Sequence, residues 1–123
     1  MQTEEIGPRD WRSFFEGFSR AHEGWLANVE VLGQLGAQPV ASELPLVGIV
    51  VDGPARKRSL SIVLGGGDEL MTHTISKPAH VQIERTDQGA DAAVEIESKD
   101  GEKTLLTFRT TAPTEEVDGV LRP

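Results

Sequence analysis

Short runs rich in apolar residues follow one another closely through most of this chain, from residue 25 to residue 108. The runs are 25–32, 44–51, 59–64, 70–75, 80–85, 92–98 and 104–108. Most of them alternate apolar and polar residues with the period of two that is typical of β-strands. No stretch between two runs reaches the dozen or more residues that a parallel crossover needs, so we expect antiparallel pairing. The pattern predicts a strongly twisted antiparallel sheet or small barrel of about six or seven strands.

One amphipathic helix is predicted before these strands, at about residues 10–22. Its aromatic residues fall at positions i, i+3, i+4 and i+7, which form one face of an α-helix: Trp11, Phe14, Phe15 and Phe18. Asp10 is suited to the N-cap, and Gly24 is suited to the end of the helix. Five of the six aromatic residues lie within 11–25, so we expect this stripe to pack against the sheet in an α+β fold.

The chain has 123 residues, a length that suits one domain with its own hydrophobic core. We expect a single domain over 1–123, with a flexible N-terminus at 1–9, a folded core at 10–109 and a tail at 110–123. Residues 44–51 are apolar on both faces, which predicts a central strand covered on both sides.

The last two runs predict a hairpin with a defined register. A three-residue loop at 99–101 puts Gly101 at the last position, where a left-handed conformation is needed. That register pairs Val94 with Leu106 and makes one largely apolar face. A two-residue Asp-Gly turn would shift the register by one and mix apolar with charged residues on both faces. We therefore favour the three-residue loop.

The charge and the residue types exclude several classes of function. The net charge is −8, from 12 basic and 20 acidic residues, which disfavours general nucleic-acid binding. The chain has no cysteine, which excludes disulfides and cysteine catalysis and fits a reducing cytoplasm. No window is long and apolar enough for a transmembrane helix, and the N-terminus has no apolar run typical of a signal peptide. We expect a cytoplasmic protein with neither a nucleic-acid nor a membrane partner.

Two of the three histidines lie seven positions apart in the stretch LMTHTISKPAHVQIE. If 70–75 and 80–85 form a hairpin with a connection of three or five residues, His73 lies beside Ile83 on the apolar face. His80 then points to the opposite side, so the two histidines cannot share a metal ion. We expect His73 to be a half-buried structural residue, with a ligand-contacting role as the alternative.

The third histidine, His22, follows the aromatic stripe. We expect it to bond a carbonyl at the end of the helix, as basic side chains there commonly do. An HExxH zinc motif would need a histidine at position 26, which is leucine. No catalytic, cofactor-binding or metal-binding residue is predicted. If a pocket exists between helix and sheet, its expected lining is His22, Trp25 and His73.

Two further motifs have simple structural interpretations. The sequence LGGGDE lacks the lysine and the following helix of a phosphate-binding loop, so a hairpin loop is predicted there. The basic cluster Arg56–Arg58 lies in a short connection and is interpreted as a solvated turn tip.

The combination WRSFFEGFSRAHEGWLANVEVLG, ASELPLVGI and LMTHTISKPAHVQIE resembles a family of small bacterial proteins known only as a domain of unknown function. The resemblance covers the chain from about Trp11 to Phe108. It implies a stand-alone, single-domain, cytoplasmic bacterial protein. It carries over no catalytic residue, because the family has none assigned.

Two functions from different classes remain open. We expect a soluble non-enzymatic binding or accessory module, because small antiparallel domains without a paired acid, base and nucleophile seldom catalyse reactions. The alternative is a small enzyme or small-molecule-binding protein with a pocket near His22, Trp25 and His73. Edge strands of a small sheet need a partner or a shield, so a homodimer is the expected assembly.

Overall fold

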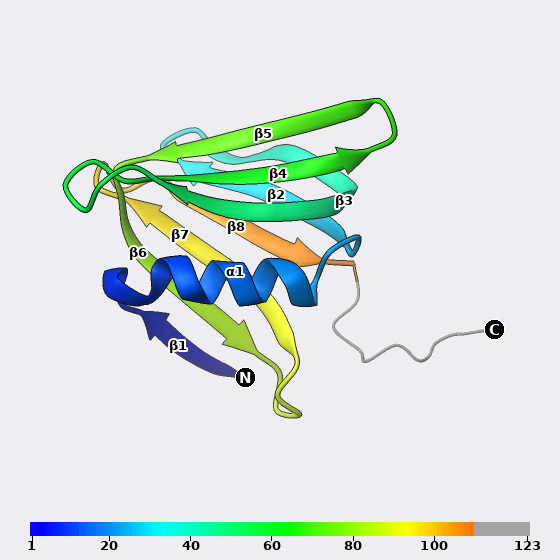
Figure 1. Cartoon of the computed structure of the whole chain (residues 1–123), viewed down its shortest axis with the longest axis horizontal. Coiled ribbons are helices and arrows are strands. Elements are labelled where there is room, and N and C mark those ends of the chain that lie inside the picture. The colour runs from blue at the N-terminus through cyan, green and yellow to red at the C-terminus, as the bar shows by residue number, and fades with distance from the viewer. Residues whose placement is uncertain (110–123) are drawn as a thin grey trace.

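The computed structural model describes residues 1–109, which form one eight-stranded antiparallel sheet and one α-helix (Figure 1). The elements are β1 (Gln2–Ile6), the short 3₁₀ helix η1 (Pro8–Asp10), α1 (Trp11–Ala21), β2 (Leu26–Gly33), β3 (Gly36–Asp52), β4 (Ser59–Gly66), β5 (Glu69–Ser76), β6 (Pro78–Arg85), β7 (Asp91–Ser98) and β8 (Lys103–Phe108). The strand order is β1-β6-β7-β8-β2-β3-β4-β5. The α+β prediction is confirmed, but the sheet has eight strands rather than six or seven. The predicted tail at 110–123 lies outside the described residues.

The additional strand is β1, which lies in the segment that we expected to be flexible. Its first four residues are exposed and only Ile6 is buried. It pairs with β6 from Gln2 opposite Arg85 to Ile6 opposite Val81. Backbone hydrogen bonds hold an edge strand of this kind, so hydrophobic alternation in the sequence does not reveal it.

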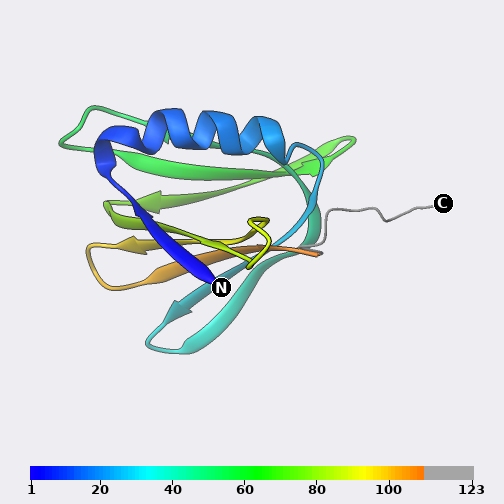
Figure 2. The same cartoon turned by 90° about the horizontal axis from the view of Figure 1, so that it is seen from below.

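The long strand β3 belongs to both halves of the sheet. Residues 36–45 pair with β2, and residues 46–52 pair with β4 (Figures 1 and 2). A register shift between Leu46 and Gly48 changes which residues face the core. Val47 and Val50 are therefore 44% and 46% exposed. The prediction that residues 44–51 form a strand covered on both sides is wrong. Apolar residues occur at both even and odd positions because the bulge reverses which positions point toward the core.

Helix α1 lies beside the second half of β3. The backbone N–H of Ile49 donates to the Ser19 hydroxyl at 2.9 Å, and Arg12 Nη1 donates to the carbonyl of Val51 at 2.9 Å. These bonds satisfy strand groups at an edge that β2 no longer pairs. At the other side, Trp11 Nε1 donates to the carbonyl of Ile6, at the end of β1, at 2.9 Å. The helix thus bridges two parts of the sheet (Figure 2).

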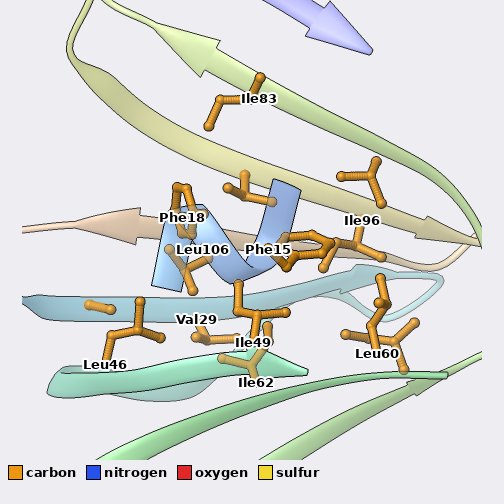
Figure 3. Close-up of a cluster of buried hydrophobic side chains, with 14 of the residues drawn as sticks. Phe15, Phe18, Val29, Leu46, Ile49, Leu60, Ile62, Ile83, Ile96 and Leu106 are labelled. Atoms are coloured by element: carbon orange, nitrogen blue, oxygen red, sulfur yellow. The ribbon is translucent and has the colours of Figure 1, made fainter. Parts of the chain in front are cut away.

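The predicted aromatic stripe faces the core. Trp11, Phe15 and Phe18 are 3%, 1% and 5% exposed, and Phe14 is half-buried against them. Phe15 and Phe18 lie among aliphatic side chains from several strands (Figure 3). The strand residues buried with them include Val29, Leu46, Ile49, Leu60, Ile62, Ile83, Ile96 and Leu106.

The β7–β8 hairpin has the predicted register. Val94 lies opposite Leu106, and Glu97 lies opposite Lys103. Gly101 has a φ of 93°, the left-handed conformation on which the choice of a three-residue loop depended.

The connection between β5 and β6 differs from the prediction. These strands do not form a hairpin: β5 pairs with β4, and β6 pairs with β1 and β7. Lys77 alone separates them, with a φ of 52°, and Pro78 follows it. The left-handed residue turns the chain from the last strand of the sheet order to the second. This turn brings the β5–β6 joint, the β3–β4 loop, the β7–β8 loop and η1 to one end of the molecule, at the left of Figure 1.

Candidate functional site

A pocket of about 770 Å³ lies at the end of the molecule where α1 begins. It is lined by Pro8, Arg9, Trp11, Ala55, Arg56, Lys57, Arg58, Ser59, Ser76, Lys77, Pro78, Ala79 and Lys99. We call it the basic pocket. Its volume is within the range of about 300–1,000 Å³ that is typical of small-molecule sites.

The charge of the basic pocket is opposite to that of the chain. Among residues 1–109, no aspartate or glutamate lines it, whereas six lysines and arginines do: Arg9, Arg56, Lys57, Arg58, Lys77 and Lys99. None of the six forms a salt bridge with another of residues 1–109. Like charges brought together in one pocket repel, so this arrangement is unfavourable for folding by itself. Such a cluster in a chain of net charge −8 indicates a site for an anion.

Of the six cations that line the pocket, Arg58 is the one with a side-chain hydrogen bond to another of residues 1–109. Its Nη1 donates to the carbonyl of Pro8, and its guanidinium carbon lies 5.9 Å from the centre of the Trp11 ring. Its buried Nε has no hydrogen-bond partner among residues 1–109. A carbonyl and an aromatic face orient this guanidinium without neutralising its charge.

Backbone geometry fixes the segments that carry the other cations. In the β3–β4 loop, Lys57 N–H donates to the Pro54 carbonyl at 2.9 Å. Gly53 has a φ of 86°, and a Cβ there would come within 2.4 Å of the Lys57 carbonyl oxygen. Across the pocket, Lys99 N–H donates to the carbonyl of Lys77 at 2.9 Å. The basic side chains therefore extend from defined turns, one of which contains the left-handed Lys77.

Asp100 follows Lys99 but is engaged in its own turn. Its carboxylate accepts hydrogen bonds from the Ser98 hydroxyl and from Glu102 N–H. The Ser98 bond contributes most to a lowered pKa of Asp100, and the positive charge of Lys77 contributes least. Asp100 lines a different pocket of about 700 Å³, beside the β2–β3 hairpin, together with Glu102 and without a basic residue.

His22 lies at the opposite end of α1. Its side chain is 6% exposed; its Nδ1 lies 2.8 Å from the Phe18 carbonyl oxygen and its Nε2 lies 3.3 Å from Asp91 Oδ2. The predicted bond to a helix-terminal carbonyl is confirmed. The Phe18 carbonyl oxygen can only accept a hydrogen bond, so Nδ1 is the donor in this contact, and Nε2 faces the Asp91 carboxylate. Its ring stacks on Phe108 at 4.8 Å and contacts Trp25 edge-on at 4.6 Å.

The charges around His22 form a connected series. Asp91 also accepts a bond from Arg85 Nε at 3.1 Å, and Arg85 Nη1 donates to Glu4 at 2.8 Å. We call His22, Phe18, Trp25, Phe108 and Asp91 the His22 cluster. Every charge in this series has a partner, which is typical of a structural element.

The remaining histidines lie on opposite faces, as predicted. His73 is half-buried and faces the same side of β5 as Ile75, but it lies opposite Ile62 of β4 rather than beside Ile83. Burial lowers the pKa of His73, and the nearby charge of Glu102 opposes this shift. His80 is exposed, and its Nδ1 lies 2.9 Å from Glu5 Oε2. That hydrogen bond is the main reason that the pKa of His80 is raised.

The predicted pocket residues do not all meet. His22 and Trp25 are in contact, whereas no ring contact within residues 1–109 joins His73 to either of them. None of the three lines either pocket described above. Over the same residues, no three side chains of the metal-binding types gather around one point, and no helix is long and apolar enough to cross a membrane.

Sequence reasoning identified three of the six cations of the basic pocket but not the pocket itself. The cluster Arg56–Arg58 was interpreted as a solvated turn tip; Arg56 and Lys57 are exposed in that turn, and all three residues also line the pocket. Arg9, Lys77 and Lys99 come from three other segments, and their proximity depends on the fold. Two features of the sequence could have indicated the pocket: the tripeptide RKR in a turn that follows Gly53, and the single lysine, Lys77, between two predicted strands.

Comparison with known proteins gives one match. The model of a family of unknown function, DUF5335, matches residues 2–117 of the chain. No curated protein matches, and no solved structure matches.

Proposed function

The chain belongs to DUF5335, a family whose function is unknown, and we propose that it is a non-enzymatic module that binds an anionic ligand in the basic pocket. One observation carries this proposal: six cations without ion-pair partners among residues 1–109 line a single pocket in an acidic chain. An anion would relieve their mutual repulsion and supply the acceptors that their N–H groups lack.

The lining of the basic pocket supports binding rather than catalysis. Within residues 1–109 it offers the hydroxyls of Ser59 and Ser76, but neither a histidine nor a carboxylate that would serve as a general base. The alternative, an enzyme centred on His22, has weaker support. Both nitrogens of His22 are occupied by a carbonyl and a carboxylate, so neither is free to transfer a proton to a substrate.

The setting of this function is also a proposal. We propose a single-domain module that acts in the cytoplasm of a bacterium and does not bind nucleic acid. The lack of cysteine supports the compartment, and the net charge of −8 supports the exclusion of nucleic acid.

We propose a homodimer that pairs through β5, the last strand of the sheet order. Its outer edge carries neither proline nor lysine to discourage pairing, and Leu70 on this strand is 68% exposed. Light scattering at high micromolar concentration tests this assembly. A mass of about 13.3 kDa would exclude the dimer, and a mass twice as large would support it.

Trp11 provides a direct signal for anion binding. It lies beneath Arg58, so a ligand that engages Arg58 changes the environment of the indole. In a Trp25→Phe background, fluorescence reports Trp11 alone, because the chain has two tryptophans. We expect a saturable change on titration with inorganic pyrophosphate at low ionic strength, weakened by added sodium chloride.

A matched pair of variants assigns the binding to the pocket. Arg56→Gln with Lys57→Gln removes two pocket charges and should weaken pyrophosphate binding by about tenfold or more. Arg20→Gln with Arg109→Gln changes the net charge equally at residues that do not line the pocket, and should leave binding unchanged. Equal losses in both variants, or no saturable binding by the unmodified pocket, would refute the proposal.

A further inference from the structure

The arrangement of charges in the basic pocket indicates a ligand with more than one anionic group. The six cations come from four separate segments: Arg9, the loop 56–58, Lys77 and Lys99. A single small anion engages the groups nearest to it, whereas charges spread over a pocket of about 770 Å³ suit a ligand with several anionic groups in a row.

The uncharged part of the lining supplies little for recognising other chemical groups. Among residues 1–109, Trp11 is its only aromatic residue, and Trp11 is 3% exposed beneath Arg58. These residues therefore offer no ring surface for a nucleobase to stack on. The described lining also has no asparagine, glutamine or carboxylate side chain, the groups that usually accept hydrogen bonds from sugar hydroxyls and base amino groups.

The types of cation in the pocket favour phosphate. Three of the six are arginines, whose planar forks match the oxygens of phosphate or carboxylate in pairs. The other three are lysines, which act as point charges and suit a run of neighbouring oxygens. Phosphoryl groups carry more charge and more acceptor oxygens per unit length than carboxylates do.

We infer that the ligand of the basic pocket is a linear polyphosphate, recognised through its phosphate chain alone. This inference rests on the anion-binding function proposed above. The chain would extend from the loop 56–58 toward Lys77 and Lys99, whose main chains are already joined by a hydrogen bond. The same phosphate chemistry occurs in free polyphosphate and in the triphosphate of a nucleotide. Comparing the affinities for tripolyphosphate and for ATP distinguishes these two sources.

The test compares four probes by isothermal titration calorimetry with the full-length protein at low ionic strength and without divalent cations. Sodium tripolyphosphate should bind about tenfold or more tightly than orthophosphate, and more tightly than citrate. ATP should bind no more tightly than tripolyphosphate, because the pocket offers its base no contact. ATP binding tenfold tighter than tripolyphosphate would overturn the inference in favour of a nucleotide.

Other outcomes separate this inference from the proposed function. If orthophosphate and tripolyphosphate bind equally well, or citrate matches tripolyphosphate, the pocket binds anions but the polyphosphate assignment is wrong. If none of the four probes binds, both the assignment and the anion-binding function fail.

A single substitution tests whether the ligand spans the pocket. Figure 2 shows the β5–β6 joint between the β7–β8 loop and the β3–β4 loop that carries residues 56–58. Lys99 is exposed in the β7–β8 loop, so Lys99→Gln should fold normally. We expect it to weaken tripolyphosphate binding severalfold and to leave orthophosphate binding unchanged, since a short anion on the loop does not need Lys99. Equal weakening of both probes, or of neither, would contradict a chain that spans the pocket.

Discussion

The two ends of helix α1 hold a nitrogen-bearing side chain in similar ways, with one difference. At the C-terminal end, His22 lies on aromatic rings and bonds the Phe18 carbonyl; at the N-terminal end, Arg58 lies on Trp11 and bonds the Pro8 carbonyl. Of these two side chains, only His22 has a carboxylate beside it among residues 1–109, that of Asp91. The contrast teaches that the ring and the carbonyl position the side chain. A neighbouring carboxylate determines whether its remaining N–H groups are engaged within the fold or stay available to a ligand.

The surroundings of each end agree with this distinction. Asp91 continues through Arg85 to Glu4, so charges near His22 alternate in sign. Among the described residues that line the pocket with Arg58, every charged side chain is basic. We therefore interpret the C-terminal end as a structural element and the N-terminal end as a binding site.

The largest effect is expected from removing the aromatic packing between the two ends. Phe18→Ala should lower the free energy of unfolding by about 3–5 kcal/mol, because the ring is 5% exposed and contacts His22 and Phe108. Urea denaturation measures this loss. Phe14→Ala, at a half-buried position of the same helix, should cost less. An unchanged stability of Phe18→Ala would place the stripe outside the core.

The next effect concerns the carboxylate that distinguishes the ends. Asp91→Asn should lower the free energy of unfolding by about 1–3 kcal/mol, because Arg85 and the buried His22 lose the carboxylate that they share. Glu95→Gln, which breaks the more exposed pair with Lys103, should cost less than about 1 kcal/mol. A double-mutant cycle with His22→Gln should show coupling between His22 and Asp91. Additive losses would mean that the contact contributes nothing.

The two histidines of the sheet also differ in whether a carboxylate is paired with them: His80 has Glu5, and His73 has no such partner among residues 1–109. Burial lowers the pKa of His73, so its charged form is disfavoured in the fold. Stability should fall as pH drops below the unfolded pKa of about 6.5. Denaturation at several pH values should show that His73→Gln removes this loss. If the loss persists unchanged, another group is responsible for it.

His80 should behave in the opposite way and with a smaller effect. Its pKa is raised, mainly by the hydrogen bond that it donates to Glu5, so its contribution is fully present below about pH 6.5. The contribution is lost as pH rises through the raised pKa. Because the contact is exposed, we expect His80→Gln to change stability very little at any pH. A large loss for His80→Gln in acid would show that β1 depends on this pair.

The features that the sequence predicts correctly depend on local chemistry. The spacing of Trp11, Phe15 and Phe18 defines a helix face, and Gly101 defines the register of the β7–β8 hairpin. Both follow from a few neighbouring residues. The separation of His73 from His80 follows from alternation within each strand, even though their strands are not paired with each other.

The features that the sequence does not predict depend on non-local pairing. Strand β1 has polar side chains and is held by the backbone of β6. Lys77 has no local signal for its left-handed conformation, yet it sends the chain to a different part of the sheet. The basic pocket combines both difficulties, because its cations come from segments that are far apart in the sequence.

The most direct test of the account is the stability gained from tripolyphosphate. The wild type is compared with a variant that carries Arg56→Gln, Lys57→Gln and Lys99→Gln. Without the anion, we expect the variant to be at least as stable as the wild type, because the three charges repel their neighbours and have no partners among residues 1–109. Tripolyphosphate at about 100 times its dissociation constant should raise the wild type's free energy of unfolding by about 2.7 kcal/mol and the variant's much less. A variant that is less stable than the wild type, and that gains equally from tripolyphosphate, would show that these cations serve the fold and that the N-terminal end of α1 is no binding site.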